Sequence, residues 1–246
     1  MRTRDVDDAR LLDGWDRAVT LPRPWRELAV LESASGTPMA DLSRLSIGER
    51  DRQLLQLRIA LFGPQMECET SCPACGTRLE LPVDARTLLV DAPTHDANAF
   101  VVHEGTTHVR FRLPDSIDVA ACLQGGADPG TAAMTLARRC VQMCDGEAEG
   151  GDGAPYSDDL LMRVADRMAS LDAQADLVFS LTCIDCAHVW EAPFDPAAAL
   201  LADVEAYMAR LTGDVHQLAR AYGWAEASIL AMGASRRQRY LALVQQ

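Results

Sequence analysis

The sequence contains no lysine, and all 23 of its basic residues are arginine. This absence excludes chemistry that needs a lysine amine, such as a Schiff base, a phosphate-loop lysine or a serine–lysine dyad. Aromatic residues make up only 5% of the 246 residues, so leucine, valine, alanine and methionine must build the core. No apolar run approaches the roughly 20 residues that span a bilayer, and we expect no membrane insertion.

The N-terminus also lacks the apolar stretch of a secretion signal, so we expect a cytoplasmic protein. The net charge of −13 argues against nucleic-acid binding, because contacts to phosphate supply most of the non-specific affinity. No phosphate loop, dinucleotide fingerprint or nucleophile elbow is present, and His95, His103 and His108 lack ligand spacing. We therefore expect a protein that is not an enzyme.

Eight cysteines in a cytoplasmic chain favour a metal site or buried thiols over disulfides. Four of them form two Cys-x-x-Cys pairs, Cys72 with Cys75 and Cys183 with Cys186. Each pair can direct two thiolates at one ion, and four thiolates complete the tetrahedral shell of structural zinc. The sequence therefore predicts one structural Zn2+ held by both pairs, with no open position for catalysis.

The similarity between the two pairs extends into the residues that follow them. Both copies read Cys-x-x-Cys, three residues, a large apolar residue, Glu, any residue, Pro, an apolar residue and Asp. The pattern predicts a zinc knuckle that leads into a strand, with Asp84 or Asp195 as the N-cap of a helix. Gly76 suits the positive φ of such knuckles, whereas Ala187 in the second copy should cost about 1 kcal/mol.

Other interpretations of the cysteines remain open. A thioredoxin-like thiol-redox motif would precede a helix, whereas these pairs precede predicted strands, and four buried thiols without a metal are a further alternative. Cys68 and His188 lie close enough along the chain to replace a ligand, although we favour no such role for them. Cys140 and Cys144 are predicted to share one face of a helix and, with Cys122, to be buried thiols.

The hydrophobic pattern predicts an α+β fold: a helical protein with two zinc-knuckle/β-hairpin units meeting at one zinc-ribbon-like site and a C-terminal helical arm. Ser46 and Glu49 form the capping box of a helix over 46–63. Further predicted helices cover 116–123, 131–144, 158–171, 196–222 and 225–232, and predicted strands cover 79–83, 100–102, 108–113 and 176–182. This order suggests an N-terminal helical extension (1–45), a zinc-clipped core (46–195) with an acidic mobile loop near 145–158, and a C-terminal part (196–246) with an Arg-rich tail.

The C-terminal part has the features of two kinds of interaction module. A long helix, a turn and a short helix could form a helix-turn-helix DNA reader, and a zinc-ribbon regulator that binds nucleic acid is the alternative function. Because the chain is acidic and has only three clustered arginines there, we favour a helical hairpin that docks onto another protein. The predicted contact residues are His216, Tyr222, Trp224, Ile229, Leu230, Arg236, Arg237 and Tyr240.

Four segments carry a resemblance to a known family. They are Ser46 to Pro64, both cysteine pairs, Val109 to Pro114, and a C-terminal pattern from Glu205 to Tyr240. Together they resemble the baseplate proteins, or baseplate hub assembly chaperones, of contractile-tailed phages and phage-tail-like contractile injection systems, over about residues 45–245. The resemblance implies a non-enzymatic structural or assembly role, exerted through contacts with the hub, spike or other tail proteins.

Overall fold

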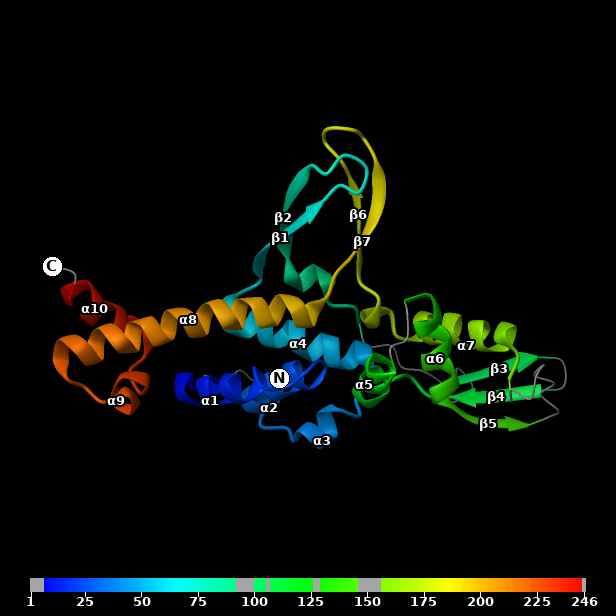
Figure 1. Cartoon of the computed structure of the whole chain (residues 1–246), viewed down its shortest axis with the longest axis horizontal. Helices are drawn as coiled ribbons and strands as arrows, with labels where there is room; N and C mark the ends of the chain where they lie inside the picture. The colour runs from blue at the N-terminus through cyan, green and yellow to red at the C-terminus, as the bar shows by residue number, and fades with distance from the viewer. Residues whose placement is uncertain (1–6, 92–99, 105–106, 126–128, 146–155, 245–246) are drawn as a thin grey trace.

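The structure is a computed structural model that describes residues 7–91, 100–104, 107–125, 129–145 and 156–244. Figure 1 shows a body of helices, two β-hairpins that project together from one side of it, and a small sheet with its own helices at one end. The C-terminal helices lie at the opposite end, along the extension of the longest helix. The mixture of helices and small antiparallel sheets confirms the predicted α+β class.

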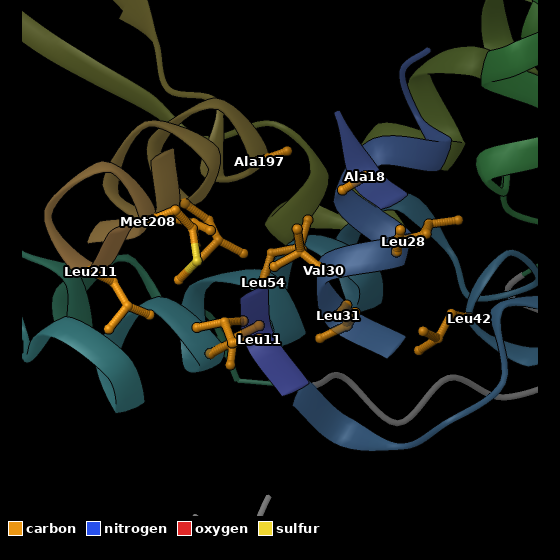
Figure 2. Packing of buried hydrophobic residues seen from close by; sticks show 14 of the residues in the cluster. Leu11, Ala18, Leu28, Val30, Leu31, Leu42, Leu54, Ala197, Met208 and Leu211 are labelled. Carbon is orange, nitrogen blue, oxygen red and sulfur yellow. The ribbon is translucent and has the colours of Figure 1, made fainter. Parts of the chain in front are cut away.

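The helical body is built by four helices that come from both ends of the chain. Figure 2 shows how Leu11, Leu31, Leu54 and Met208, each from a different helix, point toward one another in the buried core. Burying each such side chain contributes about 1.5–3 kcal/mol. The helices are α1 (Asp8–Ala18), α2 (Trp25–Ser35), α4 (Ile47–Phe62) and α8 (Pro196–Tyr222), with the short α3 (Met39–Leu42) beside them.

The caps predicted from the sequence determine where α4 and α8 begin. The Ser46 side chain accepts a hydrogen bond from the Glu49 amide at 3.2 Å, and Gly63 ends α4. Asp195 accepts hydrogen bonds from the amides of Ala197 and Ala198, so it caps α8 as expected. A side-chain acceptor at this position satisfies amides that the first turn of a helix leaves without a partner.

The two hairpins have the same internal register. In the first, β1 (Gln65–Ser71) pairs with β2 (Arg78–Asp84), and in the second, β6 (Val178–Thr182) pairs with β7 (Val189–Pro193). Each hairpin is antiparallel, and the cysteine knuckle forms the turn that joins its strands. The strand β1 was not predicted, because four of its seven residues are exposed and polar and its buried face carries only Met66, Cys68 and Thr70.

A three-stranded antiparallel sheet, ordered β3–β4–β5, lies at the end of the molecule opposite the C-terminal helices. Its strands are β3 (Val101–Glu104), β4 (Thr107–Phe111) and β5 (Val141–Asp145), and the helices near it are α5 (Ser116–Gln124), α6 (Pro129–Cys140) and α7 (Asp158–Leu171). Val109 and Phe111 of β4 are buried against Leu160 and Val164 of α7.

The helix predicted over 131–144 is wrong at its C-terminal end. The chain leaves α6 at Cys140 and continues as β5, which pairs with β4. This long-range pairing satisfies the backbone groups that a longer helix would have bonded locally, and β-branched Val141 favours the strand. Cys140 and Cys144 therefore do not share a helix face. Most of the acidic segment predicted as a mobile loop, residues 146–155, lies outside the described residues.

The C-terminal residues form helices rather than an Arg-rich tail. Gly223, with φ of 68°, ends α8, after which α9 (Glu226–Leu230) and α10 (Ala234–Val244) fold back against it. Arg237 and Leu241 lie four residues apart on α10 and form its buried face. Two residues are too few to reveal an amphipathic helix in the sequence. No helix in the described ranges is both long and apolar enough to cross a membrane.

Candidate metal centre

The structure brings the four cysteines of the two knuckles together, with all four Sγ atoms within 4.8 Å of one another. The Sγ atoms of Cys72 and Cys186 lie 3.7 Å apart, and those of Cys75 and Cys183 lie 3.5 Å apart. A tetrahedral ion with metal–sulfur bonds of about 2.3 Å would place its ligands about 3.8 Å apart. The arrangement therefore fits one tetrahedral metal ion.

Equivalent backbone hydrogen bonds shape the two knuckles. The Gly76 amide donates to the Cys72 carbonyl at 2.9 Å, and the Ala187 amide donates to the Cys183 carbonyl at 3.0 Å. The first cysteine of each pair also donates its amide across the turn, to Thr77 and His188 respectively, at 2.9 Å in both cases. Each turn thus holds its two sulfur atoms on the same side, as a chelating pair requires.

Both knuckles need a left-handed residue directly after the second cysteine. Gly76 has φ of 78° and Ala187 has φ of 57°, and Ala187 is the one non-glycine residue with positive φ in the described part of the chain. The expected equivalence of these positions is therefore confirmed. A non-glycine residue in this conformation carries a strain of about 1–2 kcal/mol, because its Cβ approaches the following carbonyl oxygen.

Replacing Ala187 with glycine should stabilise the fold by about 1 kcal/mol and raise the melting temperature by about 3 °C, because the strain disappears. Thermal unfolding followed by circular dichroism measures the change. Ala74→Gly, in the first knuckle and without positive φ, is the control and should not stabilise the protein. A rise of the same size in both variants would contradict this explanation.

Burial differs within each pair. Cys72 and Cys183 are 2% exposed and pack with Leu79 and Trp190 from the strands that follow them, whereas Cys75 and Cys186 are exposed at the tip. The tips are joined by a hydrogen bond of 2.6 Å that the Thr77 hydroxyl donates to the Asp185 carboxylate. The sequence did not reveal this link, because it depends on how two distant turns meet in space.

The electrostatics of the four sulfur atoms favour binding of a cation. Hydrogen bonds that Cys75 shares with the side chain and backbone of Thr77 lower the pKa of Cys75 to about 6. The His188 backbone acts to lower the pKa of Cys186, but hydrogen bonds with the other three thiols outweigh it and raise this pKa to about 12. The Cys75 thiol therefore ionises readily, whereas the neighbouring Cys186 thiol resists ionisation, because adjacent thiolates repel each other. A bound cation would remove this conflict.

Cys68, Cys122, Cys140 and His188 lie outside this four-sulfur group. Cys68 is half-buried in β1, and the exposed His188 ring stacks on Trp190. Cys122 and Cys140 are buried, as predicted, and burial raises the pKa of the Cys140 thiol to about 12. The Cys144 side chain is not among the described groups.

The predicted C-terminal contact residues divide into exposed and buried groups. Ile229, Leu230 and Arg237 are buried by the chain itself, so they support the packing of α9 and α10 and offer no surface to a partner. The rings of Tyr222, Trp224 and Tyr240 form a cluster at the end of α8, with centroids 4.5–5.9 Å apart. His216 and Arg236 are exposed, and the Arg236 guanidinium lies 5.8 Å from the Tyr240 ring centroid.

Comparison with known proteins identifies a family. A family model described as T4 bacteriophage base plate protein matches residues 29–175, more than half of the chain. The match runs from α2 through the first hairpin and the three-stranded sheet, and it ends before the second hairpin. No curated protein and no solved structure matches the chain. The second cysteine pair and the pattern from Glu205 to Tyr240 lie outside the matched range, which instead begins earlier than the predicted residue 45. The match confirms the resemblance to baseplate proteins over residues 29–175: the chain belongs to the family of T4 bacteriophage base plate proteins.

Proposed function

We propose that the protein is a non-enzymatic structural or assembly component of the baseplate of a phage-like contractile tail, made in the cytoplasm and stabilised by one Zn2+. The main evidence for this proposal is the family match over residues 29–175. The architecture supports it, because the body, the hairpins and the arm extend in different directions and expose separate surfaces. Such a shape suits a protein that contacts several neighbours in an assembly.

Zinc is the metal that best suits the four cysteines. Soft thiolate ligands in a tetrahedral arrangement select zinc or iron over harder ions. Four protein sulfurs complete the shell, so the ion has no position for substrate or water and its role is structural. Elemental analysis of the purified protein should find close to one zinc per chain, without the visible absorption bands of an iron–thiolate centre.

The C-terminal arm consists of the end of α8 with α9 and α10. Its exposed part is the surface that we propose for contact with a hub, spike or other tail protein. Tyr222 is 39% exposed beside Trp224, and Arg236 lies next to Tyr240. Tyrosine, tryptophan and arginine are enriched among residues that dominate binding energy in protein interfaces. Three of the 13 aromatic residues of an aromatic-poor chain are thus gathered at one end of the molecule.

Co-expression with hub and spike proteins tests both parts of this proposal. The wild-type chain should co-purify with at least one tail component, and the double variant Tyr222→Ala/Arg236→Ala should bind it at least about tenfold more weakly. Met162→Ala is the matched control, because Met162 is an exposed apolar residue on α7, far from the arm. Unchanged binding by the double variant would exclude the arm, and failure to bind any tail protein would count against the baseplate role.

A further inference from the structure

A cavity of about 500 Å3 lies where the three-stranded sheet meets the start of α4. Its volume falls within the range of about 300–1,000 Å3 that is usual for ligand sites. Its polar lining consists of three arginines, Ser46, Gln142 and the Asp115 carboxylate, and apolar side chains cover another part of it. The residues that matter for the argument are Arg44, Arg110, Arg112, Gln142, Phe100 and Leu113.

An irregularity in the sheet shapes this cavity. Arg110 pairs with Met143 and Phe111 pairs with Val141, so Gln142 is an extra residue of β5 with no opposite partner. Such a β-bulge redirects neighbouring side chains, and bulges are common beside functional sites. Here Arg110 and Phe111, which would face opposite sides of a regular strand, both line the cavity together with Gln142.

The cavity has unused positive charge. The Arg112 guanidinium is held by Asp118 through contacts of 2.6 and 3.0 Å, whereas Arg44 reaches Asp115 only at 3.7 Å and its side chain is 70% exposed. Arg110 is exposed and has no hydrogen bond or ion pair with any residue that the structure describes. In a protein of net charge −13, the Arg110 guanidinium is therefore available to an anion, and the exposed Arg44 guanidinium can be shared between Asp115 and that anion.

The apolar surface beside the arginines indicates which kind of molecule the anionic group belongs to. Phe100 and Leu113 are half-buried at the cavity, and the Phe100 ring meets the Phe111 ring edge-on at 6.0 Å. A bare inorganic anion would gain nothing from this surface. A nucleic acid, which carries one negative charge per phosphate, would be repelled by the acidic chain more strongly than a segment with one or two carboxylates. A carboxylate next to an apolar side chain matches both parts of the lining.

We propose that this cavity binds an acidic, apolar peptide segment of a neighbouring tail protein, an inference that rests on the proposed baseplate function. Arg110 and Arg44 bind the carboxylate of the segment, since a guanidinium donates two parallel hydrogen bonds to a carboxylate. The Gln142 amide, also without a partner among the described residues, bonds to the peptide backbone. Phe100 and Leu113 receive the apolar side chain.

Fluorescence anisotropy on the full-length chain tests the proposal with a labelled Gly-Asp-Phe-Glu-Leu-Gly peptide. A twin peptide carries Asn and Gln in place of Asp and Glu. The acidic peptide should bind at least about tenfold more tightly than its twin, because only carboxylates form ion pairs with Arg110 and Arg44. Arg110→Gln should remove that advantage, whereas Arg239→Gln, the loss of an exposed arginine on α10, should leave binding unchanged within about twofold.

Three results would overturn the proposal. They are equal binding of the two peptides, unchanged binding by Arg110→Gln, and no saturable binding at millimolar peptide. A competition experiment with 3-phenylpropanoate provides a fourth test. If this compound binds as tightly as the peptide, the occupant is a small carboxylate and not a protein segment, and the proposal is overturned. Because the isolated chain is used, this experiment can fail while co-purification with tail proteins succeeds, so the two proposals are tested separately.

Discussion

Replacing Cys72 or Cys183 with serine should empty the metal site and lower the melting temperature by about 10 °C, the largest effect that we expect from a single substitution. The unfolded chain presents its cysteine pairs separately, with 107 residues between Cys75 and Cys183. Gathering four thiolates in that state would require closing a loop of this length, at a cost of about 4–5 kcal/mol. A metal held by these four cysteines would therefore bind the folded protein selectively and stabilise it by mass action.

Metal content by elemental analysis and thermal unfolding by calorimetry measure these effects in the same samples. Cys122→Ser is the matched control, because Cys122 is also buried but lies on α5, outside the four-sulfur group. It should retain one equivalent of metal and melt within about 3 °C of the wild type. If all three serine variants lost metal and stability equally, the assignment of the ligands would be wrong.

The features that sequence analysis predicted well are those with a local cause. The repeated Cys-x-x-Cys pattern, Gly76 and the capping aspartates each act within a few residues, so their geometry follows from the chain alone. The long helix was predicted over 196–222, where the structure has it, because its apolar residues keep a helical period for seven turns. The resemblance to baseplate proteins was likewise inferred from short motifs, of which those between Ser46 and Pro114 lie inside the range that the family model matches.

The features that sequence analysis missed depend on contacts between distant segments. The strand β5 exists because β4 offers it a pairing edge, and its own residues fit a helix nearly as well. Arg237 was predicted as a surface residue, as charged residues usually are. It is buried because Asp8, 229 residues earlier in the chain, accepts from its guanidinium at 2.8 Å. The Arg110 cavity arises in the same way, from a bulge that no sequence pattern marks.

Replacing Asp118 with asparagine should have the second largest effect, a loss of about 3 kcal/mol of stability. The Asp118 side chain is 1% exposed and accepts hydrogen bonds from Arg112, Arg139 and the Asp115 amide. It thereby connects α5 to the end of β4 and to α6. An asparagine amide would turn a donor toward these donors, remove the countercharge of Arg139, and leave Arg112 only the more distant Asp115 carboxylate, at 3.9 Å.

The pH dependence of this loss distinguishes an electrostatic cause from a packing defect. Burial acts to raise the pKa of Asp118, but hydrogen bonds from Arg112 and Asp115, with the charges of Arg112 and Arg139, lower it to about 2. A pKa below the unfolded value of about 3.9 means that the stabilisation is fully present above pH 4 and is lost as the pH falls toward 2. The stabilities of Asp118→Asn and the wild type, measured by urea unfolding, should therefore differ equally at pH 7 and pH 5, and the difference should fall to about a third near pH 2.5.

Asp159→Asn supplies the comparison for Asp118→Asn. Asp159 is 81% exposed and pairs with Arg163 at 3.6 Å on the surface of α7, so its loss should change stability by less than about 0.5 kcal/mol. A gap between Asp118→Asn and the wild type that stayed constant down to pH 2.5 would show that Asp118 acts through packing and not through its charge.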